Sequence, residues 1–436
     1  MLSNNEEQSA PIKEIYKEID QYKDQIVSNI SRIVRCKSVM EKSQPGKPFG
    51  QGPYQALQIA LEISRELGLK TADLDGYVGY AEYGEGEDYV AVPVHLDVVP
   101  EGTGWTVDPY SGVVKDGKIF GRGSSDNKSP AIAAIYSLKI LKDLNIKTKR
   151  RVRVIFGTNE ETGMECLDYY FKKESLPLYG FSPDAGYPAY NREKGIMSLY
   201  LEKDTNELAQ YTDISSIEAG SAFNVVPEFC TVTFNTPYKD DLEVLSDISK
   251  GEPGKVYYIN ERYGKVIASR GTPAHGSTPE DGLNAIAVML EYLYEKLPNI
   301  KECGFLNFIW NKIGYEPDGA SLGIAMEDSL SGKLSNNLGL FSMTGEKASA
   351  GLNIRYPVTC KGEDVLKRLK VSAGDQNIQV ALESDSKPLY IPEDHALIQK
   401  LLAAYEKVTG EKGELRSMGG GTYARKLQNR GVAYGG

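Results

Sequence analysis

The 436-residue chain has few histidines and cysteines, no excess of positive charge and no long apolar run. Its 50 Lys and Arg are outnumbered by 60 Asp and Glu, which gives a formal charge of −10. A net acidic chain argues against nonspecific nucleic-acid binding, which requires a basic surface. The longest apolar stretch, residues 89–100, is interrupted by His95 and Asp97. It falls short of the ~20 residues of a membrane span. The sequence predicts neither a nucleic-acid partner nor a membrane partner.

The cysteines and the first residues of the chain indicate in which cellular compartment the protein is found. The five cysteines are odd in number and form no CxxC pair, which favours reduced thiols over a disulfide framework. Residues 1–7 lack the basic region and apolar stretch of a signal peptide. Both observations predict a cytoplasmic protein. The cysteines are Cys36, Cys166, Cys230, Cys303 and Cys360.

The first half of the chain alternates helical and strand patterns. At ~150 residues per domain, the length suggests two or three domains. Apolar residues recur at helical spacing in some segments and form short buried runs in others, which favours an α/β layer fold. Helices are expected at 12–33, 54–67 and 130–144, and strands at 89–94, 118–120 and 151–156.

The pattern changes after about residue 187. Strand-like stretches alternate there with helices, which indicates an inserted α+β domain over 187–387, and the α/β pattern resumes near 388 with a helix at 395–409. One domain is therefore predicted from 1–186 together with 388–436. Within the insertion, strands are expected at 196–201, 230–234, 255–259 and 265–268, and helices at 284–296 and 362–371.

Only three histidines occur: His95, His275 and His395. His95 directly follows a buried strand, and ligands bind at the carboxyl ends of strands in open α/β sheets. Asp97, two residues on, suits a carboxylate that orients a metal-ligating ring. A buried histidine paired with Asp97 for structural reasons fits equally well.

Four acidic residues follow other strands or turns of the same half. Asp126 could cap a helix or bridge two metal ions. Glu160 and Glu161 could complement a helix dipole, or one could bind metal while the other acts as general base. Asp184 is locally only a turn residue. Taken together with His95, these residues predict a Zn²⁺ or Mn²⁺ pair held ~3.5–4 Å apart.

The ordered motifs resemble the family of di-metal aminoacylases, ArgE/DapE deacylases and glutamate carboxypeptidases. Within that family the chain is most similar to the bacterial PepV/Sapep-type dipeptidases. The resemblance extends from about residue 12 to the end. Its motifs are Val94–Pro100, Gly104–Tyr110, Gly121–Lys128, Glu160–Glu161, Ser182–Ala185 and Gly419–Arg425.

The resemblance implies two divalent ions, Zn²⁺ or Mn²⁺, in a catalytic domain formed by 1–186 and 388–436. His95 and Asp184 would hold one ion, Glu161 the other, and Asp126 would bridge them. The remaining implied roles in this domain are catalytic: Asp97 would orient His95, and Glu160 would take a proton from the attacking water.

The same resemblance makes 187–387 a lid domain. His275 would stabilise the oxyanion of the tetrahedral intermediate. Asn224, Arg355 and Gly420 would bind the ends of a small peptide, since an Arg fork suits a free carboxylate. His395 receives no function, and a monomer or small homo-oligomer is expected.

Two departures from the family pattern stand out. The family commonly has Asp-Asp-Lys-Gly where this chain has Asp126-Asn127-Lys128-Ser129, which we interpret as local variation. The family also carries a last ligand histidine downstream of the segment that corresponds to 419–425, and no histidine follows His395 here. We therefore expect the C-terminal part of the catalytic domain to be truncated and the ion beside Glu161 to lack an imidazole ligand.

These observations predict a metal-dependent dipeptidase. One alternative is a deacylase of N-acyl amino acids, whose lid would need an apolar pocket instead of a partner for a free amine. The other is a non-catalytic peptide-binding relative, which the absent histidine favours and the presence of Glu160 disfavours.

Overall fold

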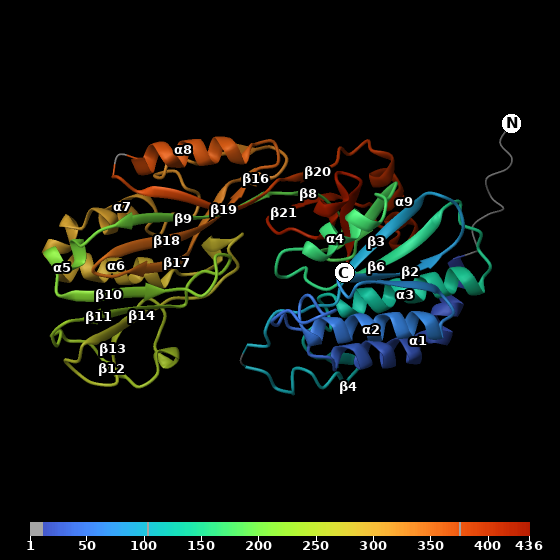
Figure 1. Cartoon of the computed structure of the whole chain (residues 1–436), viewed down its shortest axis with the longest axis horizontal. Coiled ribbons are helices and arrows are strands. Elements are labelled where there is room, and N and C mark those ends of the chain that lie inside the picture. Colours follow the sequence, from blue (N-terminus) through green and yellow to red (C-terminus); the bar gives the residue numbers. More distant parts are fainter. Residues whose placement is uncertain (1–11, 103, 375) are drawn as a thin grey trace. The chain divides into compact units, whose positions relative to one another are not determined.

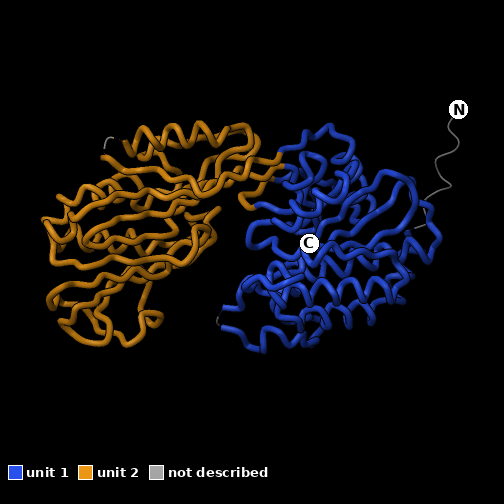
Figure 2. The backbone as a smooth tube through the Cα atoms, viewed as in Figure 1, with its two compact units in different colours: residues 1–191, 390–416, 421–436 blue, residues 192–389, 417–420 orange. Residues whose placement is uncertain are grey.

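The computed structural model describes residues 12–102, 104–374 and 376–436. The chain forms two compact units, coloured separately in Figure 2. Unit 1 comprises Met1–Asn191, Tyr390–Arg416 and Gly421–Gly436, and unit 2 comprises Arg192–Leu389 and Ser417–Gly420. The prediction drawn from residues 1–7 lies outside the described residues. Among the helices that the structure describes, none has the length and apolar character that a membrane crossing requires.

Unit 1 is built on a mixed nine-stranded sheet with the order β1-β2-β6-β3-β7-β22-β8-β20, in which β21 also pairs with β8 (Figure 1). Its strands are β1 (Lys70–Leu74), β2 (Val78–Tyr83), β3 (Tyr89–His95), β6 (Arg151–Gly157), β7 (Tyr179–Ser182), β8 (Gly186–Glu193), β20 (Leu389–Tyr390), β21 (Leu415–Met418) and β22 (Gly431–Gly435). A separate hairpin pairs β4 (Val113–Lys115) with β5 (Lys118–Phe120). The helices are α1 (Ile12–Val34), α2 (Gln51–Glu66), α3 (Lys128–Asp143), α4 (Glu165–Lys173), α9 (Ala396–Thr409) and the 3₁₀ helix η4 (Tyr423–Leu427).

Both faces of this sheet are buried, as the apolar run of β3 requires. Val92 and Val94 pack in the core formed with α1, α2 and α3. Tyr89 and Ala91, whose side chains point to the opposite face, pack with α4 and η4. A strand that is buried on both faces has a continuously apolar sequence, and this pattern led to the prediction of a buried strand here.

Unit 2 contains a second nine-stranded sheet with the order β12-β13-β14-β11-β10-β17-β18-β9-β19. Its strands are β9 (Gly195–Asp204), β10 (Ile214–Ala219), β11 (Phe229–Phe234), β12 (Val244–Leu245), β13 (Val256–Ile259), β14 (Val266–Arg270), β17 (Ser335–Met343), β18 (Lys347–Tyr356) and β19 (Gln379–Ser386). The helices are α5 (Glu207–Tyr211), α6 (Ala285–Lys296), α7 (Gly304–Lys312) and α8 (Gly362–Gly374), with the 3₁₀ helices η1 (Ile248–Lys250), η2 (Pro279–Asp281) and η3 (Pro298–Glu302). A short hairpin pairs β15 (Glu327–Asp328) with β16 (Gly332–Lys333). One hydrophobic core joins the sheet to α6, α7 and α8.

The predicted α/β class is confirmed, because both units are sheets flanked by helices. The predicted helices and strands are present, with ends within three residues of those expected. The paired strands β17 and β18 of unit 2 were not predicted. They carry Asn, Ser and Gly among their apolar residues, which obscures a simple alternation.

Strand β6 begins in a buried ionic cluster. The Arg153 side chain is only 2% exposed. Its Nε donates to Glu82 at 2.8 Å, and its Nη1 donates to Tyr170 at 2.7 Å and to Glu174 at 2.8 Å. The guanidinium also lies 3.7 Å from the ring centroid of Tyr80. Because the charge is paired and hydrogen-bonded, the cluster can be buried inside unit 1.

We expect Arg153→Ala to lower the free energy of unfolding by about 3–5 kcal/mol, because the substitution leaves the buried Glu82 carboxylate without this partner. Denaturant unfolding of the variant measures the loss. Arg150→Ala is the control, since Arg150 is about half exposed and its Nε lies 3.8 Å from an exposed Asp88. Equal destabilisation by the two substitutions would contradict a structural role for the buried cluster.

Candidate metal centre

The predicted ligands of unit 1 come from neighbouring parallel strands. β3 lies between β6 and β7 and is parallel to both. His95 ends β3, Glu160 and Glu161 follow β6, and Asp184 follows β7. Asp126 lies in the turn before α3. Because the carboxyl ends of parallel strands meet at one edge of a sheet, residues far apart in the sequence converge there.

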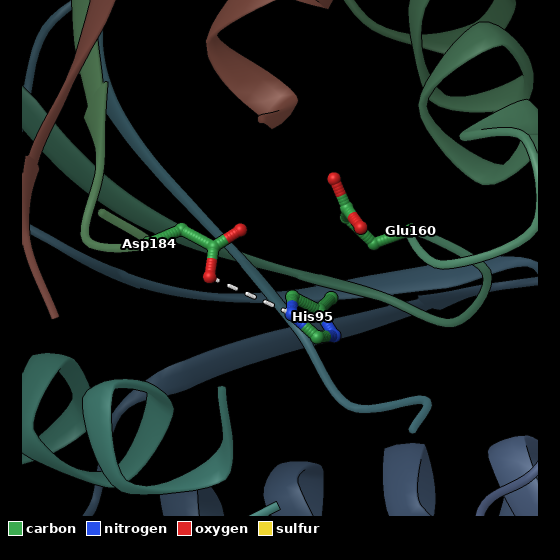
Figure 3. A group of neighbouring side chains, drawn as sticks. All are labelled: His95, Glu160 and Asp184. Carbon is green, nitrogen blue, oxygen red and sulfur yellow. Dashed lines mark ion pairs between the residues drawn. The ribbon is translucent and has the colours of Figure 1, made fainter. Parts of the chain in front are cut away.

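The five side chains form two overlapping groups around His95. In one, His95, Glu160 and Asp184 offer ligand atoms within 4.8 Å of one another, and in the other, His95, Asp126 and Glu161 do so. Nε2 of His95 lies 2.7 Å from Oδ1 of Asp126 and 3.6 Å from Oδ1 of Asp184. Figure 3 shows Glu160 and Asp184 gathered around the His95 ring. His95 belongs to both groups, whereas the resemblance implied that it serves one ion.

Asp97 contacts His95 in a different way from the one expected. Nδ1 of His95 lies 2.9 Å from the main-chain oxygen of Asp97, and the nearest carboxylate oxygen is 3.6 Å away. The carboxylate instead accepts hydrogen bonds from the main-chain N–H groups of Glu160 and Glu161, at 2.9 and 3.0 Å. When Nδ1 donates to that carbonyl, Nε2 keeps a lone pair for a cation. Asp97 therefore orients the ring through its backbone and holds the glutamate turn through its side chain.

The site carries more negative charge than His95 can balance. Burial lowers the pKa of His95, but hydrogen bonds to Asp126 and Asp184 outweigh burial and raise it well above its ordinary value. Burial raises the pKa of Glu160 well above its usual range, raises that of Asp184, and raises that of Glu161 to about 7. Carboxyl groups with raised pKa values hold protons that a bound cation would displace.

The donor set fits a divalent cation. One imidazole and several carboxylates suit Zn²⁺ and Mn²⁺. In addition, Oε1 of Glu160 is buried and has no hydrogen-bond partner among the described residues. A buried carboxylate oxygen without a partner is costly in a purely structural role. The residues present therefore fit a divalent cation.

Asn127 connects three of the ligand-bearing segments, a role for which no local sequence signal exists. It is the N-cap residue of α3, but its side chain makes no capping hydrogen bond. Its Nδ2 donates to the carbonyl of Pro183 at 2.6 Å and to Oδ1 of Asp184 at 2.8 Å, and its Oδ1 accepts a long hydrogen bond of 3.4 Å from the main-chain N–H of His95. The interpretation as local variation missed these contacts because Asp184 lies 57 residues downstream.

The predicted residues of unit 2 form two local groups. The segment that carries Asn224 pairs with the His275 segment. The Gly276 N–H donates to the Asn224 carbonyl at 2.8 Å, and Val225 forms an isolated antiparallel β-bridge with His275. Nη1 of Arg355 donates to the carbonyl of Gly419, the neighbour of the predicted Gly420, at 3.0 Å. Backbone pairing and one arginine therefore bring together residues that lie far apart in the sequence.

Two details of unit 2 and of α9 were not evident from the sequence. Nδ2 of Asn337 donates to the carbonyls of Phe223 and Val225 and so holds the Asn224 segment from behind. His395 caps α9, because its Nδ1 accepts a hydrogen bond from the main-chain N–H of Leu397 at 3.3 Å. The Asn337 contacts had no sequence signal, whereas the position of His395 at a helix start agrees with leaving it without a function.

We expect Asn127→Ala to weaken binding of a divalent cation roughly 10–100-fold, the usual effect of losing a contact that orients a ligand. The substitution removes the N–H donors that meet Asp184 and the Pro183 carbonyl. Competition with a chromophoric chelator measures the affinity. Asn191→Ala is the matched control, since the buried Asn191 donates to the Ile391 carbonyl at 2.7 Å and lies in neither ligand group. An unchanged affinity in Asn127→Ala would rule out the orienting role.

Comparison with known proteins places this chain among peptidases. The model of peptidase family M20/M25/M40 matches residues 91–435. "Putative dipeptidase YtjP" of Bacillus subtilis is 36% identical over 424 residues, which cover 96% of this chain and 91% of that protein. A "Putative dipeptidase" of Staphylococcus epidermidis is 32% identical over 95% of this chain and 90% of that protein.

Solved structures agree on the fold. The di-peptidase Dug1p of Saccharomyces cerevisiae aligns with a TM-score of 0.60 at 13% identity, over 97% of this chain and 91% of that one. The M20 family metallo-carboxypeptidase Sso-CP2 of Sulfolobus solfataricus aligns with a TM-score of 0.56 at 16% identity, over 94% of this chain and 91% of that one. The family predicted from the motifs is thereby confirmed: the chain belongs to peptidase family M20/M25/M40.

Proposed function

We propose that this protein is a metal-dependent dipeptidase that hydrolyses the peptide bond of dipeptides with a free amino terminus. The observation that carries the proposal is the buried, unpartnered Oε1 of Glu160 beside a set of metal ligands. A general base must reach the attacking water, and an oxygen without a protein partner is available for it. The names of the bacterial relatives support dipeptides as the substrate class.

His95, Asp126, Glu161 and Asp184 would hold two divalent ions, with Asp126 between them. Zn²⁺ or Mn²⁺ fits these ligands. When bound, such ions lower the pKa of water and polarise the scissile carbonyl. Unit 1 is then the catalytic domain and unit 2 the lid.

The residues of this chain would divide the remaining work. Glu160 takes a proton from the attacking water and passes it to the leaving amine nitrogen. Asp97 keeps the Glu160 main chain in place. His275 donates a hydrogen bond to the developing oxyanion.

The ends of the substrate would meet unit 2. Asn224, Arg355 and Gly420 bind the termini of the dipeptide, and the cation of Arg355 attracts the free carboxylate. All five cysteines are free thiols, which supports a reducing, cytoplasmic location.

The proposal predicts hydrolysis of dipeptides by metal-stripped protein refilled with Zn²⁺ or Mn²⁺, and no hydrolysis before refilling. A panel of dipeptides, their C-terminal amides, tripeptides and N-acyl amino acids, followed by amine release, measures the preference. We expect amides and tripeptides to be poor substrates, because carboxylate binding fixes the length. Equal rates on a dipeptide and its amide would refute carboxylate binding, and faster cleavage of N-acyl amino acids would identify a deacylase instead.

Glu160→Ala should keep the fold and the bound metal but lose about 10²–10⁴-fold or more in turnover, the scale for loss of a general base. Elemental analysis of the purified variant checks the metal, and kcat on the best dipeptide checks the reaction. Glu165→Ala is a control, because Glu165 begins α4 after the same turn and lies in neither ligand group. Normal turnover in Glu160→Ala would contradict the assignment of Glu160 as the general base.

A further inference from the structure

His275 lies in the segment of unit 2 between β14 and η2, and its imidazole meets two groups of one residue. Nδ1 of His275 is 2.7 Å from Oγ of Ser277 and 3.3 Å from the main-chain nitrogen of Ser277. The side chain of His275 is otherwise exposed. The same ring nitrogen therefore faces a hydroxyl and a backbone N–H from a residue two positions away.

These contacts determine where the imidazole carries its proton. A backbone N–H can only donate, so Nδ1 must present its lone pair to it. The Ser277 hydroxyl can rotate to donate to the same nitrogen. In the neutral ring one nitrogen accepts and the other donates, so the proton lies on Nε2. The ring then offers an N–H donor on the side that faces away from Ser277.

The surroundings also keep the ring uncharged. Although His275 is exposed, partial desolvation of its ring lowers its pKa, and the positive charge of Arg355 lowers it further. A proton on Nδ1 would in addition point at the N–H of Ser277, and two donors facing each other repel. Neutrality and tautomer are therefore both set within unit 2.

The Ser277 backbone is held from two other positions. Oγ of Ser335, on β17, donates to the Ser277 carbonyl at 3.1 Å. A Cβ built on Gly419 would lie only 2.6 Å from Cβ of Ser277, so the glycine permits this close approach. Ser277 is thus fixed relative to the strand behind it and to the 417–420 segment.

We infer that Ser277 is a positioning residue that fixes His275 as the Nε2–H tautomer and thereby makes it a hydrogen-bond donor toward the substrate. This inference rests on the proposed role of His275 at the oxyanion. A carbonyl oxygen that gains negative charge needs a donor that is already oriented, and a ring with its proton on Nδ1 would present a lone pair instead.

Nitrogen-15 spectra of the histidine rings test the tautomer directly. The protein has three histidines, so His275→Gln identifies the His275 signals by their loss. In the Zn²⁺-loaded protein we expect the Nε2–H pattern. Ser277→Ala removes the hydroxyl but keeps the backbone N–H, so the ring should stay mainly Nε2–H with a detectable Nδ1–H fraction. Ser277→Asp, which offers an acceptor, should shift the ring further toward Nδ1–H or the charged form. Thr278→Asp, which adds the same charge one residue later, should match the parent protein.

Kinetics on a dipeptide test the consequence. Ser277→Asp should lower kcat by roughly 10²-fold or more, the loss expected when an oxyanion donor is removed. Ser277→Ala should lower kcat less, and neither should change KM by a comparable factor, because the contact forms mainly in the transition state. Thr278→Asp should keep the parent kcat.

The spectra and the kinetics distinguish the positioning role of Ser277 from the proposed role of His275 at the oxyanion. A mixture of tautomers in the parent protein, or unchanged spectra in both Ser277 variants, would overturn the role of Ser277 and leave the proposed dipeptidase untouched. A changed tautomer with normal kcat would keep the role of Ser277 and remove His275 from the oxyanion.

Discussion

The excess of carboxylates around one buried imidazole is the constraint on which unit 1 depends. His95 is 1% exposed, and five acidic side chains lie in its two ligand groups or beside them. Like charges at such distances cannot all remain ionised without a counter-charge. Burial and the neighbouring carboxylates raise the pKa values of Glu160 and Asp184. A divalent ion would stabilise the ionised carboxylates, so its binding would be coupled to the release of protons.

Hydrogen bonds from neighbouring N–H groups stabilise these closely spaced carboxylates. Main-chain N–H groups of Glu160 and Glu161 point at the Asp97 carboxylate, and the Asn127 amide points at Asp184. Each donor partly neutralises an oxygen and also fixes its position. Strand β6 follows the same principle: it begins with Arg151 and Arg153, both paired with Glu82, continues through apolar residues and ends before the acidic turn. The strand can therefore carry charge at both ends while its middle remains in the core.

Of the elements that the structure describes, local patterns in the sequence predicted six of the nine α-helices and seven of the 22 strands. The side chains predicted as metal ligands and general base also lie close together. A buried apolar run followed by His95 indicates a ligand at the end of a strand, and the order of motifs indicates the family. The contacts that position these ligands were not predictable in the same way. Asn127 reaches Asp184 across 57 residues, and Asn337 holds the Asn224 segment across 112 or more. Register between distant strands, not local propensity, decides which side chains meet.

Asp97 illustrates the limit at a single residue. Its spacing from His95 correctly indicated a neighbour of the ring, yet it is the backbone carbonyl that meets Nδ1. Spacing alone does not distinguish a carbonyl from a carboxylate two atoms away. The assignment of ligands to separate ions has the same limit, since His95 lies in both groups.

Arg355 shows why the tautomer of His275 needs hydrogen bonds as well as charge. The guanidinium is 4% exposed, donates to Gly419 and to Asn353, and lowers the pKa of His275. In the proposed complex the free carboxylate of a dipeptide approaches this cation and cancels part of its field. The effect of Arg355 on the pKa of His275 therefore becomes smaller when the substrate is bound, which is when the Nε2–H donor is needed. The N–H of Ser277 does not depend on the substrate, so it continues to exclude a proton from Nδ1 while the peptide is bound.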